Sequence, residues 1–179
     1  MSLCVALLRA VNVGGTGKLP MAVLREFAEG LGFKDVTTLL QSGNLVFASD
    51  REPDDLERLL ERETEKRLHL KTDFFVHTAK EWKAMVAQNP FPDEAARDPA
   101  RFALMPLKGA PASAQVKALE AAIVGPERIS VKGRALYAIY PDGMGQSRLT
   151  NRVIETKLAT RCTARNWNTV LKLAALVGD

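Results

Sequence analysis

The sequence has 179 residues, of which 46% are hydrophobic, and it carries a formal net charge of +4. It is long enough for one large packed domain or two small ones, and its longest apolar run, Leu3 to Leu8, is too short to cross a membrane. The two cysteines and two histidines lack disulfide or metal-ligand spacing, and the N-terminus lacks a signal-peptide pattern, so we expect a cytoplasmic protein with no metal, cofactor or membrane partner.

The first half of the sequence alternates between strand and helix patterns. Ser2 to Ala10 is an almost continuous apolar run, which is typical of a strand covered on both faces. A helix is expected next, with Pro20 in its first turn and Gly32 at its end. The order βαββαβ is completed by strands at Val36 to Leu40 and Leu45 to Phe47 around the turn QSGN, a charged helix at Asp54 to Leu68 and a strand at Thr72 to His77.

The second half repeats this order of elements. After a helix that contains Trp82, the segment NPFPD, Asn89 to Asp93, is too rich in proline for a regular element, and we place a boundary there. A final strand is not evident. The expected elements are a strand at Arg101 to Leu107, a helix at Ala114 to Val124, a hairpin of Ile129 to Val131 with Ala135 to Tyr140, and helices around Val153 to Ala159 and Trp167 to Val177.

These patterns predict an α+β fold of two ferredoxin-like subdomains packed together, each of the βαββαβ type. We expect the first subdomain at residues 1–78, a helix and proline-rich linker at residues 79–100, and the second subdomain with an extra C-terminal helix at residues 101–179. Only the topology repeats, since the two halves share no residue-level periodicity. The doubly apolar first strand agrees with a central place in its sheet.

Charge is distributed unevenly along the chain. Residues 50–66 contain eight acidic and four basic residues, whereas residues 128–172 contain nine basic and two acidic ones. A solvated charged face explains this pattern, and so does an anion-binding surface in the C-terminal third.

The first glycine-rich segment is VNVGGTGK, Val11 to Lys18. It lies between a predicted strand and a predicted helix, where such loops present backbone N–H groups to a phosphate, and this makes Asn12, Gly14, Gly15 and Lys18 candidate ligand residues. Its spacing is neither that of a Walker A loop nor that of a dinucleotide-binding loop. A flexible turn that leads into the helix is the alternative interpretation.

The second glycine-rich segment is YPDGMGQSRLT, Tyr140 to Thr150. It leaves a strand through a Pro-Asp-Gly turn and ends with Ser147, Arg148 and Thr150. Thr150 is a good N-cap for the following helix, so part of the segment serves local folding. The free N–H groups of that helix start lie beside Arg148 and would form a cradle for an oxyanion.

The segment TARNWNTVLKL, Thr163 to Leu173, begins the last predicted helix. Trp167 belongs to a row of apolar residues at helical spacing, which favours a core anchor over a platform for stacking a ligand. Asn166 is a candidate helix cap, while Arg165 and Asn168 have no place in the helix pattern. They either bond a neighbouring loop or face a ligand, and both interpretations remain open.

No pattern predicts catalytic residues. His69 and His77 have no partner nearby in the sequence and are typical of structural or solvated histidines. Cys162 follows Arg161, but an ordinary cysteine is favoured over a reactive thiolate. An RNA-binding sheet would need aromatic residues where KGRALYAIY has arginine, leucine and isoleucine.

Several segments along essentially the whole chain resemble the domain of unknown function 1697 family: LLRAVNVGG, LLQSGNLVF, NPFP, YPDGMGQSRLTNRVIETKL and RNWNTVLKL. The resemblance implies two ferredoxin-like subdomains, and it implies no established reaction, substrate or cofactor. Ala10 stands where the family pattern has glycine, and Arg148 where it has lysine, which changes the donor geometry there. The pattern falls on Arg9, Asn12, Gly14, Gly15, Ser42, Gly43, Asn44, Tyr140, Pro141, Gly143, Gly145, Ser147, Thr150, Arg165, Asn166, Trp167, Asn168 and Thr169.

We expect a binding module for a phosphate-bearing ligand, either a nucleotide or a nucleic acid. The alternatives are an enzyme that acts on a small anionic substrate and a protein-interaction module without a ligand. A nucleic-acid site needs a broad basic face and shows steep salt dependence, whereas a small-molecule enzyme needs a closed pocket. The candidate ligand-binding residues are Arg9, Asn12, Gly14, Gly15, Lys18, Ser42, Asn44, Ser147, Arg148, Thr150, Arg165, Asn166 and Asn168.

Overall fold

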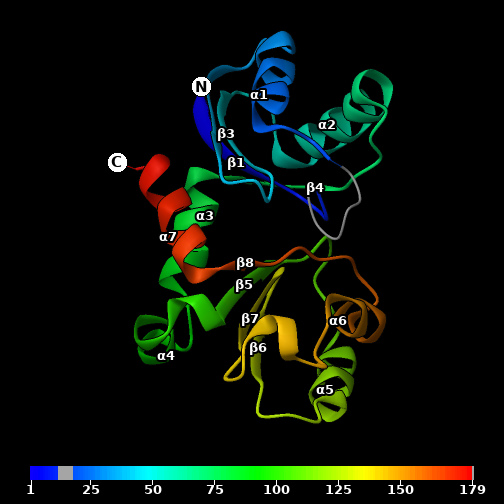
Figure 1. Ribbon diagram of the computed structural model, residues 1–179, viewed down its shortest axis with the longest axis vertical. Helices are drawn as coiled ribbons and strands as arrows, with labels where there is room; N and C mark the ends of the chain where they lie inside the picture. The colour runs from blue at the N-terminus through cyan, green and yellow to red at the C-terminus, as the bar shows by residue number, and fades with distance from the viewer. Residues whose placement is uncertain (12–17, 179) are drawn as a thin grey trace. The chain divides into compact units, whose positions relative to one another are not determined.

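The protein is a mixed α+β chain, and its computed structural model describes residues 1–11 and 18–178 (Figure 1). The chain forms two compact units, one of Met1–Ala84 with the segment from Leu173 onward and the other of Met85–Lys172. Each unit contains a four-stranded antiparallel sheet, and seven α-helices occur in the described residues. None of the helices in this described part is long and apolar enough to span a membrane.

The sheet of the first unit has the strand order β2-β3-β1-β4. The strand β1, Ser2–Leu8, pairs antiparallel with β3, Asn44–Ser49, and with β4, Phe74–Thr78. The other edge is β2, Lys34–Leu39. The five residues from Cys4 to Leu8 are all buried, on both faces of the strand. The prediction that the first strand is central in its sheet is therefore confirmed.

Two helices cover one face of this sheet, α1, Met21–Gly30, and α2, Pro53–Leu68 (Figure 1). α2 begins with a proline, whose missing N–H is not needed in the first turn of a helix. Its first turn carries acidic residues and its last turn basic ones, and both suit the helix dipole. Pro20 was expected in the first turn of α1 and is its N-cap, directly before Met21, and the helix ends before Gly32 as predicted. The core on this face is formed by Cys4, Ala6 and Leu8 of β1 with Leu24, Phe27, Leu56 and Leu60 of the helices.

The sheet of the second unit repeats the same arrangement with the order β6-β7-β5-β8. It consists of β5, Phe102–Pro106, β6, Arg128–Lys132, β7, Ala135–Ile139, and β8, Arg165–Asn166. The final strand β8, which the sequence did not reveal, is two residues long and pairs with β5. So short a strand has no alternating pattern from which to recognise it.

Helices α5, Ser113–Ala122, and α6, Asn151–Leu158, cover one face of the second sheet (Figure 1). The chain also contains α3, Ala79–Ala87, α7, Trp167–Leu176, and the short turns η1, Pro99–Arg101, and η2, Met144–Gln146.

The prediction for the proline-rich segment before the second sheet is wrong in part. The segment Asn89 to Asp93 was expected to hold no regular element, but α4, Pro92–Arg97, begins inside it. Proline has no backbone N–H, but the N–H groups in the first turn of a helix have no partner within the helix. Pro92 can therefore begin a helix, although a proline further along would interrupt one.

Candidate functional site

The predicted residues near the first glycine-rich segment belong to the first unit. Asn12, Gly14 and Gly15 lie outside the described residues, and Lys18 is exposed. The Arg9 guanidinium lies 4.0 Å from a carboxylate oxygen of Asp73, and the Arg9 backbone N–H donates to the Asp73 carbonyl at 3.0 Å. Arg9 is thus tied to the start of β4 by both its backbone and its side chain.

Ser42 and Asn44 hold the tight turn between β2 and β3. Asn44 is fully buried, and its Nδ2 donates to the Leu39 carbonyl at 2.7 Å and to Ser42 Oγ at 2.9 Å. The Leu8 N–H donates to the Gly43 carbonyl at 2.9 Å, which places the turn beside the end of β1. The structure therefore brings Ser42 and Asn44 together in contacts that stabilise the turn.

The predicted residues after β7 bond to their own loop and to the segment before β6. Ser147 Oγ donates to Glu127 Oε1 at 2.6 Å and accepts the Leu149 N–H at 2.9 Å. Thr150 Oγ1 accepts the Val153 N–H at 3.3 Å, which confirms Thr150 as the N-cap of α6. Arg148 is exposed between them.

Arg165 lies in β8 with its side chain buried. Only 6% of Arg165 is exposed, and its Nη1 donates to Thr163 Oγ1 at 2.9 Å and to the Ala164 carbonyl at 2.8 Å. Burial lowers the pKa of the guanidinium to about 10, so the group remains charged at neutral pH. These contacts are those of a residue that stabilises its own strand, and a ligand-binding role for Arg165 stays a prediction.

The two asparagines of the same segment differ in their surroundings. Asn166 Oδ1 accepts the Thr169 N–H at 3.1 Å and so caps α7, whereas Asn168 is exposed and lines an apolar depression of about 310 Å³. Arg148 and Arg165 line neither this depression nor the two others described below. The predicted residues of the second unit are therefore not gathered around one of these hollows.

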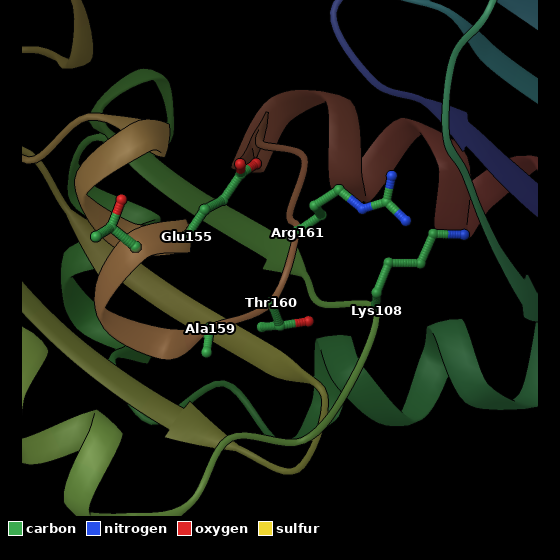
Figure 2. Close-up of a pocket in the computed structure, with 6 residues that line it drawn as sticks. Lys108, Glu155, Ala159, Thr160 and Arg161 are labelled. Carbon is green, nitrogen blue, oxygen red and sulfur yellow. The ribbon is translucent and has the colours of Figure 1, made fainter.

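The largest of these hollows, about 510 Å³, has Lys108 and Arg161 on its wall and was not found by the sequence reasoning (Figure 2). We call it the Lys108/Arg161 depression. Glu155, Thr156, Ala159 and Thr160 complete its lining, so most of it is built by the end of α6 and the segment that follows.

Backbone pairing places the two cations next to each other. Leu107, which follows β5, forms a bridge with Cys162, and the Lys108 N–H donates to the Arg161 carbonyl at 3.0 Å. Ala159 ends α6 with a φ of 54°, which turns the chain back toward β5. Figure 2 shows the Lys108 and Arg161 side chains extending in the same direction. Two positive groups from distant parts of the sequence thus point to one region of space.

The polar groups around these cations are hydroxyls and one carboxylate. Thr160 Oγ1 accepts the Gly109 N–H at 3.0 Å, which holds the loop after β5 and leaves the hydroxyl proton for another acceptor. Glu155 Oε1 accepts the Cys162 N–H at 3.2 Å, which ties this carboxylate to the segment after α6. One carboxylate and two cations leave the depression a net charge of +1. It can bind an anion by charge-assisted hydrogen bonds.

The sequence contained little that marked these residues. Arg161 belongs to the basic C-terminal third, but Lys108 lies outside it, and neither falls in a glycine-rich segment. Their proximity depends on the pairing of the segments that follow β5 and α6. No local pattern reports such pairing.

The comparisons with known proteins concern family and fold. The family model for the protein of unknown function DUF1697 matches residues 1–137, a range that includes Lys108 and ends before Arg161. A solved structure, that of the conserved bacterial protein SP0830 from Streptococcus pneumoniae, is similar with a TM-score of 0.78 and 22% sequence identity, over 99% of each chain. At that identity the likeness shows the fold alone. No curated protein matches the sequence significantly.

Proposed function

The chain belongs to the DUF1697 family of proteins of unknown function, and we propose that it binds a phosphate-bearing ligand, a nucleotide or a nucleic acid, at the Lys108/Arg161 depression. The observation that carries this proposal is the pair of cations that the backbone holds side by side, Lys108 and Arg161, with both side chains directed the same way (Figure 2). An ammonium supplies a compact charge and a guanidinium supplies a fork of donors, and together these suit the oxygens of a phosphate.

The size and charge of the depression support a nucleotide-sized ligand. Its volume of about 510 Å³ lies within the usual range for small-molecule sites. Its net charge of +1 matches the single charge of a phosphodiester, and the hydroxyl of Thr160 adds a neutral donor at the wall. A longer nucleic acid would place one such phosphodiester in the depression and extend beyond it.

Binding measurements on charge variants test the proposal. Adenosine monophosphate, inorganic phosphate and a single-stranded oligonucleotide are titrated into the wild-type protein and into Lys108→Ala and Arg161→Ala at low salt. We expect each variant to weaken binding at least about tenfold, because each removes one charge-assisted hydrogen bond. Arg148→Ala is the matched control, since Arg148 is an exposed arginine outside the depression, and it should bind within about twofold of the wild type.

The outcomes separate the hypotheses. Binding that is lost in Arg148→Ala and retained in Lys108→Ala would move the site to the second glycine-rich segment, and the absence of binding by the wild type would refute a phosphate site. Repeating the oligonucleotide titration at physiological salt distinguishes the ligands. A nucleic-acid site should weaken at least about tenfold as condensed counterions are released.

We also propose that each unit is a ferredoxin-like subdomain. The repeated strand order supports this assignment. The first strand of each unit, β1 or β5, pairs with the third and the fourth strand of that unit. A crystal structure with a different strand order in either unit would contradict this assignment. The cytoplasmic location stays a prediction from the sequence.

A further inference from the structure

A second charged depression lies elsewhere in the second unit and is independent of the phosphate proposal. Its volume is about 330 Å³, and Arg97 of α4, Arg101 of η1 and Arg128 of β6 all line it. We call it the Arg97/Arg128 depression. Three guanidiniums from three different elements that face one hollow are unusual, because like charges repel unless anions offset them.

Two of the three guanidiniums are held in place by their own chain. Arg101 Nη1 donates to the Pro141 carbonyl at 2.7 Å, and Arg101 Nε lies 3.7 Å from an Asp98 carboxylate oxygen. Arg128 Nη1 donates to Glu94 Oε1 at 3.2 Å. These bonds use only some of the five N–H donors of each guanidinium, so donors remain for a ligand.

An aromatic ring fixes the position of Arg128 further. The Arg128 guanidinium carbon lies 5.1 Å from the centroid of the Phe91 ring, within the range of a cation–π contact. Phe91 in turn packs edge-on against the buried Phe102, with ring centroids 6.3 Å apart. The planar donor of Arg128 is therefore supported by the core of the unit before any ligand arrives.

Arg97 is the third donor, and its side chain is exposed and makes no hydrogen bond or ion pair within residues 1–11 and 18–178. With Glu94 and Asp98 also in the lining, the depression has a net charge of +1, and Ile139 and Pro141 give it an apolar wall. The matching ligand carries one negative charge on a planar group and has a small aliphatic body.

We propose that the Arg97/Arg128 depression binds a small organic carboxylate, either as a free acid or as the C-terminal carboxylate of a peptide. The carboxylate oxygens accept hydrogen bonds from Arg97 and from the unused donors of Arg101 and Arg128, and the aliphatic part contacts Ile139. Guanidinium groups bind carboxylates in this two-pronged manner.

Titration with butyrate tests the proposal, with the arginine Nε–H signals of the ¹⁵N-labelled full chain as the readout. We expect the wild type to bind butyrate and the variant Arg97→Gln to bind it at least about tenfold more weakly, because one charged hydrogen-bond donor is lost. Arg97→Gln removes no side-chain hydrogen bond or ion pair from the part of the chain that the structure describes. Arg152→Gln is the matched control, since Arg152 is an exposed helical arginine outside both depressions, and it should bind butyrate as the wild type does.

Two further arms identify the ligand group and its source. Butyramide, which lacks the negative charge, should not bind. If the natural ligand is a peptide C-terminus, a short apolar peptide with a free C-terminal carboxylate should bind, and the same peptide with an amidated C-terminus should not. Equal binding of butyrate by Arg97→Gln and the wild type, or equal binding of butyramide and butyrate, would overturn the proposal. Lys108→Ala should leave butyrate binding unchanged, so failure of this site and failure of the phosphate site are distinguishable.

Discussion

The carboxylate of Glu57 on α2 accepts the backbone N–H of Val76 on β4 at 3.0 Å. Because β4 is an edge strand, this N–H points away from β1 and has no strand to pair with. The other outward N–H groups of the strand are bonded in the same way, Phe74 to Glu61 at 3.0 Å and Thr78 to Glu81 at 2.7 Å. Acidic side chains thus close an edge that would otherwise pair with another chain.

Removal of the Glu57 carboxylate should destabilise the first unit. Glu57 is only 7% exposed, so Glu57→Ala leaves the Val76 N–H without an acceptor and should lower the free energy of unfolding by about 1 to 3 kcal/mol. Glu57→Gln keeps an acceptor oxygen and should lose less. Urea denaturation measures both, with Glu65→Ala at an exposed position of α2 as a control that should change little. Equal losses for Glu57→Ala and Glu57→Gln would mean that the hydrogen bond is not the cause.

Arg165 and Trp167 can be compared by substitution because they are neighbours with different contacts. Arg165→Ala unpairs the Thr163 hydroxyl and the Ala164 carbonyl and should cost about 1 to 3 kcal/mol of stability. Trp167→Ala should cost about 3 to 5 kcal/mol, since the indole is 6% exposed and packs edge-on against Phe102 at 5.2 Å.

Thermal melts with and without phosphate measure these effects. If Arg165→Ala melts like the wild type but loses a phosphate-induced rise in melting temperature, Arg165 faces a ligand after all. Asn168→Ala, at an exposed position of the same segment, controls for the local sequence change.

Gly43 should not tolerate a side chain. Its φ is +85°, and a Cβ there would lie 2.6 Å from Val11 Cγ2 and 2.9 Å from Leu8 Cβ. Gly43→Ala combines backbone strain with a clash and should cost at least about 2 kcal/mol. Gly32→Ala is the control, because Gly32 has a φ of +89° with nothing near its Cβ position, and it should cost about 1 kcal/mol. Equal losses in chemical denaturation would show that the close approach to β1 is unimportant.

Cys4 should make the protein less stable in alkali. Burial raises the pKa of its thiol from 9.0 to about 11, and the nearby charge of Glu81 acts in the same direction. The folded state therefore holds this proton more tightly than the unfolded chain does, and the resulting stability is complete below pH 9 and is lost as the pH rises toward about 11.

Denaturation of wild type and Cys4→Ala across this pH range tests the effect. Between pH 9 and about pH 11, the free energy of unfolding of the wild type should fall by up to about 2 to 3 kcal/mol more than that of the variant. The measured quantity is the difference in slope, so a constant loss from the missing thiol does not affect the result. Parallel curves would show that Cys4 does not titrate in this way.

Much of the fold could be read from local patterns. The apolar run of β1 predicted a central strand, and the spacing of apolar residues predicted the helices within a few residues of their observed ends. Thr150 was recognised as a cap because a threonine before a helical pattern bonds its own backbone. The start of α4 at Pro92 was missed, since proline suggested a break where it in fact begins a helix.

The sequence by itself determined the central place of β1, the cap of α6 and the order of helices and strands apart from α4 and β8, because these depend on periodicity and on contacts over a few residues. Only the tertiary structure decided that Arg165 is buried in a two-residue strand beside β5, and that Lys108 and Arg161 share one depression. Both results follow from backbone pairing between distant segments. β5 and the residues directly after it pair with residues 161–166, which lie more than fifty positions later in the chain. Backbone N–H and C=O groups form this pairing, and every residue except proline has both groups. The side chains that the pairing brings together therefore show no pattern in the sequence that would predict it.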